Sequence, residues 1–373
     1  MAAKKKAKKK KATKTAKART KKTAKKAAKK KVAKKAAPRR KAPAKRKAAG
    51  VRWALGLSGS GSRSAFLVGA LKQLQAREDH SFPIIAGTGT GALVAAILAQ
   101  GRGHELDEFA ALLGSRKALR LRYPFVPHVG ANLFLASVTN TQSVYTIEGG
   151  LGQFIDRFVD IQAVFESSVE VHFVTRDMQT GAVRSFTNRG DGEQDLLRGL
   201  FAATSRPVLM PLVRAGEEGH QYTGDPLRAD ATLTTLYRAL DRADAPAVDR
   251  MLILSQGCGG EPARDYRDVV SIFERTLDIT EGVGIGNVRT ARLINALLTL
   301  RDKIPERTFA GALKSLDAET RSEVERYLEK RNMPLWHLCP DGELADVSAR
   351  TYDARAIQRA LVAGAHAAES IAG

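Results

Sequence analysis

Apolar residues along the chain form short runs that alternate with glycine-rich loops and with helical patterns. A strand-like run at residues 53–57 precedes the loop 58–64, and Leu67, Leu71 and Leu74 then recur at helical spacing. The same order of strand, glycine loop and helix returns between residues 83 and 100. Two such units in succession predict parallel strands that are joined by helices.

Further strands and helices are predicted along the rest of the chain from alternation of period two and from amphipathic runs. The strands fall at residues 169–175, 182–186, 251–255 and 335–339, and the helices at 194–204, 232–242, 269–280, 288–300, 319–330 and 354–371. This order predicts the α/β class, with a mainly parallel sheet that has helices on both faces. With 43% apolar residues the chain can bury a substantial core.

Positive charge is concentrated at the amino terminus. Of the 61 Lys and Arg residues, 25 lie in residues 1–50, which contain no Asp or Glu, while the other 36 face 39 acidic residues. The segment is built almost entirely from Lys, Ala, Thr, Arg and Pro, so it has no apolar face to pack. We therefore expect a disordered basic tail at residues 1–50, followed by one α/β domain at residues 51–373.

The tail suggests partners by its charge. Its Lys-Ala repeats, such as residues 25–31, resemble the tails of linker-histone-type and bacterial histone-like proteins. The resemblance implies salt-dependent, sequence-independent binding to nucleic acid. An anionic membrane surface would attract the tail by about 1 kcal/mol per basic residue, and a tail that only limits aggregation is the third alternative. The sequence does not separate these alternatives.

The expected location follows from what precedes and fills the domain. No apolar stretch of the secretory type occurs before Val51, and no run approaches the roughly 20 apolar residues needed to span a bilayer. Cys258 and Cys339 have neither disulfide-framework nor metal-site spacing, so we expect free thiols in a reducing compartment. We expect a cytoplasmic protein, which the tail would bring to the nucleoid or to a membrane surface.

The second glycine loop carries the chemically informative motif. It reads Gly87-Thr88-Gly89-Thr90-Gly91 and lies between a predicted strand and a predicted helix. A strand that leads into G-x-S-x-G and then a helix is a nucleophile elbow, which presents a serine beside backbone N–H donors. The serine position is occupied by Gly89, which has no side chain to attack a substrate.

Together the two loops resemble the patatin-like phospholipase family, whose members hydrolyse lipid acyl esters with a Ser–Asp dyad. The family's G-G-G-x-R-G loop is matched by residues 59–64, with Ser60 and Ser64 in place of glycines, and residues 171–177, 180–181 and 202–207 match more loosely. The resemblance implies a patatin-like fold over residues 51–373. It also implies an oxyanion or ligand site formed by Gly59, Ser60, Gly61, Arg63, Gly87, Thr88, Thr90 and Gly91.

The resemblance also points to the position of the dyad acid. The family has D-G-G or D-G-A after a short strand, and residues 221–227 here read Gln-Tyr-Thr-Gly-Asp-Pro-Leu. Without a gap the acid position falls on Gly224, and Asp225 follows one residue late. A slip of one residue turns a side chain to the opposite face of a strand. Asp225 is therefore a shifted candidate for the dyad acid.

Other residues could supply a nucleophile near the loops. Thr88 and Thr90 flank Gly89, and Ser58, Ser60 and Ser62 lie in the first loop, where we expect them to cap the following helix. The histidines, including His80, His172, His220 and His337, show no paired metal spacing, so we expect core or surface roles, no metal and no cofactor.

These observations favour one function and leave two alternatives. We expect a patatin-like protein that is inactive or impaired as a hydrolase and that binds a lipid or an acyl or anionic small molecule, with a regulatory role. The first alternative is an active lipid acyl hydrolase that uses Ser58, Ser60 or Thr88 as a displaced nucleophile with Asp225. The second is a nucleic-acid-associated protein that acts through its tail. A nucleotide-phosphate loop at residues 59–64 ranks below these because G-K-[ST] is missing.

Overall fold

The structure is a computed structural model. It describes residues 50–77, 80–113, 120–126, 129–139, 141, 143–207, 209–216, 219–224, 229–256, 286–293, 295, 304–318, 320–322, 333–340, 344 and 353–371. All of these residues belong to one compact unit, Ala48–Gly373. Residues 1–49 lie outside the described residues, so the disorder of the tail and its boundary stay predictions.

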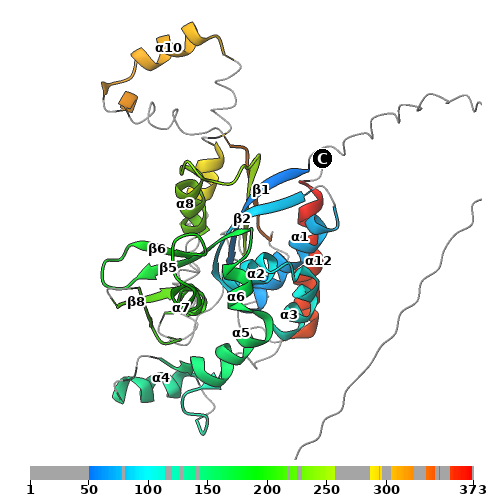
Figure 1. The fold of residues 1–373 in the computed structure, drawn as a ribbon, viewed down its shortest axis with the longest axis vertical. Helices are drawn as coiled ribbons and strands as arrows, with labels where there is room; N and C mark the ends of the chain where they lie inside the picture. The colour runs from blue at the N-terminus through cyan, green and yellow to red at the C-terminus, as the bar shows by residue number, and fades with distance from the viewer. Residues whose placement is uncertain are drawn as a thin grey trace, which may run out of the picture. The chain divides into compact units, whose positions relative to one another are not determined.

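The centre of the unit is a sheet of eight described strands in the order β10-β9-β1-β2-β5-β8-β7, with β6 also paired to β5 (Figure 1). Neighbours among the first five strands of this order are parallel, whereas β6, β7 and β8 form antiparallel pairs. The strands are β1 (Val51–Gly59), β2 (His80–Gly89), β5 (Glu170–Asp177), β6 (Val183–Thr187), β7 (Val213–Ala215), β8 (His220–Gly224), β9 (Arg250–Ser255) and β10 (Leu335–Leu338). The predicted, mainly parallel α/β sheet is confirmed.

Helices cover both faces of this sheet, and α8 and α12 lie on opposite sides (Figure 1). On one face pack α1 (Ala65–Gln75), α2 (Thr90–Ala99), α3 (Leu106–Leu113), α5 (Gly152–Phe158), α7 (Glu193–Thr204) and α12 (Ala354–Glu369). On the other face pack α8 (Ala229–Leu240) and helical residues 286–293. The remaining helices are α4 (Val129–Val138), α6 (Ile161–Phe165), α10 (Glu306–Lys314), the 3-10 helices η1 (Gly61–Ser64) and η2 (Gly103–Glu105), and the π-helix η4 (Ile147–Leu151). Strands β3 (Arg120–Leu121) and β4 (Tyr145–Thr146) form a separate antiparallel pair.

The sequence of β1 explains its central place. Its residues are apolar without alternation because helices bury both of its faces, as is usual for a parallel strand. Leu55 and Leu57 belong to the core cluster of α1 and α2, and Ala54 belongs to the cluster of α8. The sheet therefore separates two cores, and a side chain's parity along a strand decides which core it joins.

The predicted elements mostly coincide with those of the structure, with gaps outside the described residues. The strands predicted from residues 53, 83, 169, 182, 251 and 335 correspond to β1, β2, β5, β6, β9 and β10. The predicted helix 269–280 lies outside the described residues, and those at 288–300 and 319–330 lie partly outside them. The β7–β8 hairpin was missed as a pair because β7 is only three residues long and has no clear alternation.

One prediction about the cysteines is wrong. Cys339 is disulfide-bonded rather than free, and the only other cysteine of the chain is Cys258, which lies outside the described residues. Spacing along the sequence does not reveal this bond, because the bond depends on strand pairing. Cys339 directly follows β10, whose carboxyl end lies beside that of its parallel neighbour β9.

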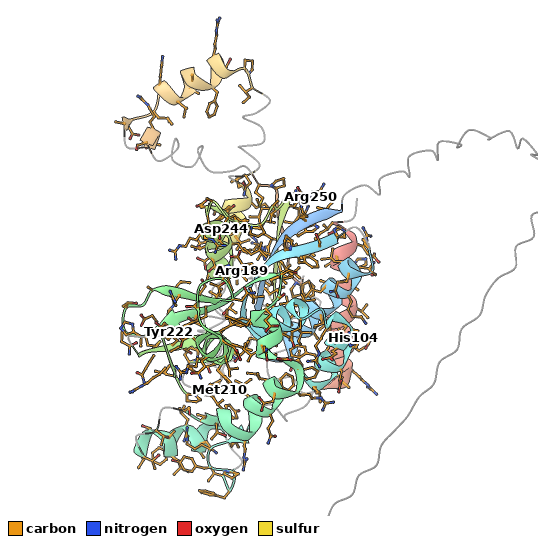
Figure 2. The ribbon with its side chains drawn as sticks, viewed as in Figure 1. His104, Arg189, Met210, Tyr222, Asp244 and Arg250 are labelled. Carbon is orange, nitrogen blue, oxygen red and sulfur yellow. The ribbon has the colours of Figure 1, made fainter. Side chains whose placement is uncertain are left out.

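The amino-terminal edge of the sheet is closed by aromatic packing. Trp53 of β1 and Trp336 of β10 meet edge to face with ring centres 5.2 Å apart. The guanidinium of Arg250 lies 5.6 Å from the Trp53 ring centre and 5.1 Å from that of Trp336, at the end of the sheet labelled in Figure 2. The glycine loops leave the sheet at the opposite, carboxyl edge.

Candidate functional site

Gly89 has the backbone of a nucleophile elbow. It ends β2 and precedes α2 with φ 59° and ψ −137°, a conformation that a residue with a side chain adopts only under strain. A strained residue between a strand and a helix is the geometry that presents a nucleophile at an elbow. The elbow is therefore formed, and the residue at its centre has no reactive group.

The glycines on either side of Gly89 are required by close packing. A Cβ atom on Gly87 would lie 2.6 Å from the carbonyl oxygen of Gly91, and one on Gly91 would lie 2.5 Å from the carbonyl oxygen of Leu57. Real Cβ atoms essentially never approach so closely. The first turn of α2 thus rests directly on the backbones of β1 and β2, which aims the free N–H groups of the helix at the sheet edge.

The first glycine loop lies beside the elbow, because Gly59 pairs with Gly89 in the parallel register of β1 and β2. Its two expected oxyanion donors are oriented but occupied. The Ser60 N–H donates to the side-chain oxygen of Gln256, and the Gly61 N–H donates to Thr90 Oγ1 at 3.0 Å. Both acceptors are neutral side-chain oxygens. In this structure, side chains of the chain itself therefore engage both N–H groups, and their role as oxyanion donors stays a prediction.

The other loop residue that the resemblance singled out is Arg63. It lies in η1 and is only 6% exposed. The buried Ser64 hydroxyl next to it packs against Gly59, where a Cβ atom would lie 2.5 Å from Ser64 Oγ. The departures of this loop from the family's glycines are thus accommodated inside the core.

The hydroxyl groups near the elbow are poorly placed to replace a serine at position 89. Ser58, Ser62 and Thr88 are fully buried, and Ser60 is 8% exposed. Ser58 and Thr88 are in register with each other and point to the α8 side of the sheet, because they share the parity of Ala54 and Ala86, which belong to the core under α8. Thr90 is engaged by Gly61.

The expectation that the loop serines cap the following helix is wrong. Ser60 stands at the N-cap position of η1, yet its side chain makes no capping hydrogen bond. The Ser62 hydroxyl instead donates to the Leu113 carbonyl at 3.4 Å, and Ser58 lies within β1. The helix begins through a 3-10 turn that follows the strand directly, so the serines face the core rather than the helix end.

The aligned acid position, Gly224, has no room for a side chain. Gly224 ends β8, and its N–H donates to the Ser205 carbonyl at 2.8 Å. A Cβ atom there would lie 2.3 Å from Ala203 O and 2.6 Å from Ser205 O, both of which are backbone atoms. Asp225 lies outside the described residues, so its role stays a prediction.

The topology nevertheless brings the two dyad positions together. β2 pairs with β5 along Glu170–Phe173, and β8 pairs with β5 along Thr175–Asp177, while β6 pairs with residues 172–176. A strand has two edges, so β2 and β8 share one edge of β5 and approach each other end to end. Gly89 follows the last paired residue of β2 by two positions, and Gly224 is opposite Thr175.

Four histidines that the sequence left unassigned have defined partners. Trp53 Nε1 donates to His80 Nδ1 at 2.7 Å, and His220 Nδ1 lies 2.8 Å from Asp177 Oδ2. Ser255 Oγ lies 2.8 Å from His337 Nε2. His172 lies between Glu170, whose Oε1 is 2.7 Å from Nε2, and Ser185, whose Oγ is 3.4 Å from Nδ1.

The charges around these histidines alter several pKa values. Burial lowers the pKa of His337 to about 4, helped by the nearby charges of Arg289 and Arg292. For Asp177, burial acts to raise the pKa, but hydrogen bonds from His220, Gln179 and Thr180 outweigh it and lower the value to about 2.

In buried Glu170, burial and hydrogen bonding likewise act on the pKa in opposite directions. Burial acts to raise its pKa, but hydrogen bonds from His172 and Arg242 outweigh that effect, and the pKa is lowered below its usual range. Arg242 donates to Glu170 Oε2 at 2.7 Å. Glu170 is therefore a buried, ionised carboxylate with two cationic or polar donors.

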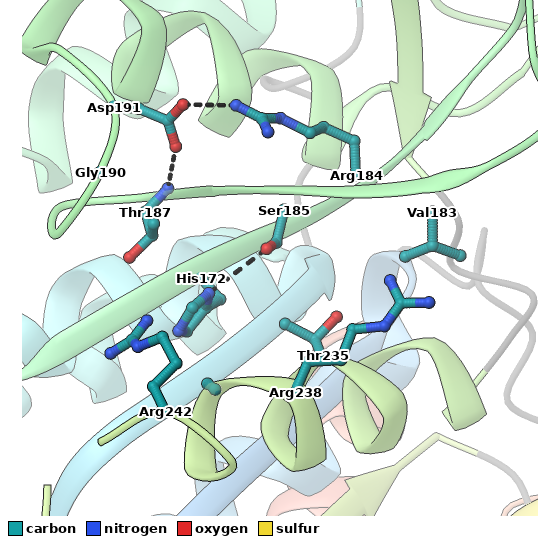
Figure 3. Close-up of a pocket in the computed structure, with 11 residues that line it drawn as sticks. His172, Val183, Arg184, Ser185, Thr187, Gly190, Asp191, Thr235, Arg238 and Arg242 are labelled. Carbon is teal, nitrogen blue, oxygen red and sulfur yellow. Dashed lines mark hydrogen bonds and ion pairs between the residues drawn. The ribbon is translucent and has the colours of Figure 1, made fainter. Parts of the chain in front are cut away.

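Two cavities lie along the antiparallel half of the sheet. One, of about 290 Å³, lies between α8 and the β5–β6 hairpin (Figure 3) and is lined by His172, Val183, Arg184, Ser185, Thr187, Gly190, Asp191, Thr235, Arg238, Ala239 and Arg242. We call it the α8 cavity. The other, of about 590 Å³, is lined by Asp177, Thr180, Ala182, Val183, Arg184, Gly190, Asp191, Gly192, Asp195, Gly216, His220 and Tyr222.

The sequence did not predict the polar side chains of these two cavities, because no local motif marks them. Their one sequence signal is the spacing of Glu170 and His172, which places both on the same face of a predicted strand.

Among the described residues, no group of three or more His, Cys, Asp and Glu side chains is placed to hold a metal ion. Likewise, no helix within the described part of the chain is long and apolar enough to cross a membrane.

Comparison with known proteins agrees with the geometry of the two loops. Residues 55–230 match the family model described as patatin-like phospholipase. The crystal structure of VipD from Legionella pneumophila matches with a TM-score of 0.38 and 13% sequence identity, over 86% of this chain and 66% of that chain, so the chain spans about two thirds of VipD. No curated protein matches the chain in sequence. The family match includes both glycine loops and Gly224, and the chain therefore carries a patatin-like phospholipase domain at residues 55–230.

Proposed function

We propose that the elbow of this patatin-like domain binds an acyl or anionic lipid group without hydrolysing it, and that the protein has a regulatory rather than a hydrolytic role at this site. The observation that carries the proposal is Gly89, which holds the elbow conformation without a nucleophile. Gly224 supports it, because the aligned acid position has no space for a carboxylate.

The occupied donors of the first loop fit a binding role. A carboxylate or phosphate oxygen at this place would replace the neutral oxygens of Gln256 and Thr90 as acceptor for Ser60 N–H and Gly61 N–H. Hydrogen bonds to a charged acceptor are roughly twice as strong as those between neutral groups, so the exchange favours the anion. The amino end of α2 adds a favourable dipole for the same charge.

The nature of the family sets the class of ligand. Patatin-like phospholipases act on lipids, so we infer that the anion is the carboxylate of a fatty acid or the head group of a phospholipid. Gln256, which accepts the hydrogen bond from Ser60 N–H, lies beyond the matched residues 55–230.

The test is the release of fatty acid from phosphatidylglycerol vesicles by the full-length protein. Wild type, Gly89→Ser and Asp225→Asn are compared, with binding of oleate measured by calorimetry on the same samples. We expect oleate binding by all three proteins and no release by any of them, because a hydroxyl at position 89 has no acid partner at Gly224.

Two results would contradict the proposal. One is phospholipid hydrolysis by wild type that Asp225→Asn abolishes, which would favour the alternative of an active hydrolase with a displaced nucleophile. The other is the absence of any oleate or vesicle binding. Hydrolysis that appears only in Gly89→Ser would show that Asp225 or another acid reaches the elbow, and it would restrict the loss of activity to the missing hydroxyl.

We propose a second function for residues 1–50, which is to hold the protein on a polyanion, with nucleic acid as the first candidate. The supporting observation is the presence of 25 basic and no acidic residues. Replacing the seven lysines between residues 4 and 11 by glutamine should flatten the dependence of log K on log salt for duplex DNA by up to about 6. An unchanged slope would contradict it, and binding to anionic vesicles but not to DNA would reassign the tail to membranes.

A further inference from the structure

A hydroxyl and an imidazole that line the α8 cavity lie in series with the buried carboxylate of Glu170. Ser185 Oγ lies 3.4 Å from His172 Nδ1, and His172 Nε2 lies 2.7 Å from Glu170 Oε1. Figure 3 shows the His172 ring between Ser185 and Arg242. A nucleophile, a base and a group that orients the base in this order define a catalytic triad by geometry, whatever the order of the residues in the sequence.

The sheet register explains why the three side chains meet. Glu170 and His172 are two residues apart on β5 and so share a face. On β6, Ser185 is opposite Val174, and Thr187 is opposite His172. Ser185 is therefore the diagonal neighbour of His172, within reach of a ring side chain. All three face α8, which supplies the opposite wall of the cavity.

The burial of the three groups suits their roles. Glu170 and His172 are each 3% exposed, which fixes their side chains, whereas Ser185 is only partly buried and lines the cavity. Because Glu170 is ionised, it accepts the proton on His172 Nε2. This tautomer is assigned from the hydrogen bond, and it leaves the Nδ1 lone pair directed at Ser185. Distances of this kind are commonly longer before substrate binds.

Three arginine side chains line the cavity. Arg184 pairs with Asp191, and Arg242 pairs with Glu170 and Asp244. Arg238 also lines the cavity, is exposed, and makes no ion pair with another described residue. Arg238 lies in the last turn of α8, and Arg242 follows the end of that helix at Leu240. An anionic group on a ligand is thus attracted to Arg238 rather than to the other two arginines.

We propose that Ser185, His172 and Glu170 form a hydrolytic site for small carboxylic esters that carry a negative charge, with Arg238 binding that charge. Ser185 Oγ attacks the carbonyl carbon while His172 Nδ1 takes the hydroxyl proton. The acyl carbon–oxygen bond then breaks, and the proton passes to the departing alcohol. Water attacks the acyl-serine, gives one proton through His172 to Ser185 Oγ, and releases the acid. Glu170 is a positioning residue, because it acts through His172.

This site is separate from the elbow. It lies on the α8 face, whereas the elbow helix α2 packs on the opposite face, and Arg238 lies outside the residues that match the family. Its volume of about 290 Å³ suits a small ester rather than a phospholipid. The inference therefore does not depend on the proposed function of the elbow, and either of them can fail alone.

The first test is covalent labelling of the full-length protein by a fluorophosphonate probe, with the labelled residue located by mass spectrometry. We expect the label on Ser185 and a loss of at least about 100-fold in labelling rate in Ser185→Ala and His172→Gln. The matched control is Ser255→Ala, which removes a buried hydroxyl that is bonded to His337 and does not line the α8 cavity. It should label like wild type.

The second test compares two chromogenic esters, p-nitrophenyl acetate and p-nitrophenyl hemisuccinate. Wild type should favour the anionic ester, and Arg238→Gln should lower kcat/KM for that ester by about tenfold while leaving the neutral ester unchanged. Glu170→Gln should lower kcat with little change in KM, since it alters the base and not the binding of the charge. Thermal unfolding of each variant identifies any general loss of fold.

The outcomes are clear for each arm. Labelling at any other serine, or hydrolysis that survives in Ser185→Ala, overturns the assignment of the nucleophile. Equal turnover of the two esters overturns the role of Arg238. If folded wild type is neither labelled nor able to hydrolyse either ester, and Ser185→Ala behaves in the same way, the proposal is overturned. Glu170, His172 and Arg242 then form only a structural ion network.

Discussion

The elbow helix α2 and the α8 cavity lie on opposite faces of one sheet. The elbow is formed by backbone atoms, whereas the α8 cavity is formed by side chains. The elbow consists of glycines whose backbones touch, and its donors are satisfied by Gln256 and Thr90. The α8 cavity consists of charged and polar side chains from β5, β6 and α8. Packing thus requires the backbone geometry of the elbow, whereas the polar cluster of the α8 cavity exists because the topology brings suitable side chains together.

Glycine 87 and glycine 91 illustrate the persistence of the backbone. Each is needed because a helix turn rests on strand backbones, a requirement that exists whether or not a serine stands at position 89. Removing the nucleophile leaves this packing intact, so the elbow remains recognisable in sequence and in structure. The presence of an elbow is therefore evidence for the fold, and the side chain at its centre is the evidence for the reaction.

The largest predicted effect concerns this packing. In Gly91→Ala the new methyl group would meet the Leu57 carbonyl at 2.5 Å, and we expect the free energy of unfolding to fall by about 3 kcal/mol or more. Urea denaturation measures it. The control is Gly311→Ala in α10, where no atom lies within 4 Å and a gain of about 1 kcal/mol in helix propensity is expected. Equal values for the two variants would contradict the packing role.

The second prediction tests the ion network of the α8 cavity. Arg242→Ala removes a donor from the buried Glu170, and we expect a loss of about 2 kcal/mol at pH 7. Asp244→Ala, which removes the exposed partner of Arg242, should cost less than about 0.5 kcal/mol. A similar loss in both variants would mean that the buried carboxylate does not depend on Arg242.

The pH dependence of this difference has a definite sign. The pKa of Glu170 is lowered in the folded protein, so its contribution to stability is complete above the unfolded value, about 4.3, and is lost as the pH falls through the folded value. The stability difference between wild type and Arg242→Ala should therefore shrink below about pH 4. Denaturation curves at pH 7, 5 and 3 measure it, and a constant difference would contradict it.

The third prediction concerns strain at the centre of the elbow. Gly89→Ala introduces a side chain at φ 59° and ψ −137°, and we expect a loss of about 2 kcal/mol. Gly181→Ala provides a control at φ 70° in a turn with no atom within 4 Å, where about 1 kcal/mol is expected. If Gly89→Ala is no more costly than the control, the elbow backbone is relaxed rather than held by its surroundings.

The smallest predicted effect tests the occupied donors. Thr90→Val removes the acceptor of the Gly61 N–H and should cost about 1 kcal/mol of stability, while the affinity for oleate rises because a competing oxygen is gone. Thr90→Ser keeps the hydroxyl and should behave like wild type. Calorimetric titration and thermal unfolding measure both quantities. Weaker oleate binding in Thr90→Val would place the ligand elsewhere.

The elbow could be predicted because its signal is local. The strand, the three glycines and the helix lie within residues 80–99, and each element follows from the periodicity of its own residues. The same locality predicted β1, α1, β5, β6, α7, α8, β9, β10 and α12. It also identified Gly89 as the position that lacks a nucleophile, which the structure leaves in the elbow conformation.

The state of the donors could not be predicted in this way. Ser60 and Gln256 are 196 residues apart, and their contact exists only because β1 and β9 are neighbours in the sheet. The absence of space at Gly224 depends on the end of α7, and the disulfide of Cys339 on the pairing of β9 with β10. The capping roles expected for the loop serines were wrong because the loop enters its helix through a buried 3-10 turn.

The sequence by itself determined the class of fold, the two glycine loops and the loss of the serine at position 89, because each depends on residues that are close together in the chain. Only the tertiary structure decided that the loop donors are occupied, and that Glu170, His172 and Ser185 meet at a cavity that Arg238 and Arg242 also line. Strand register and helix docking control those contacts, and both are set by the packing of segments far apart in sequence.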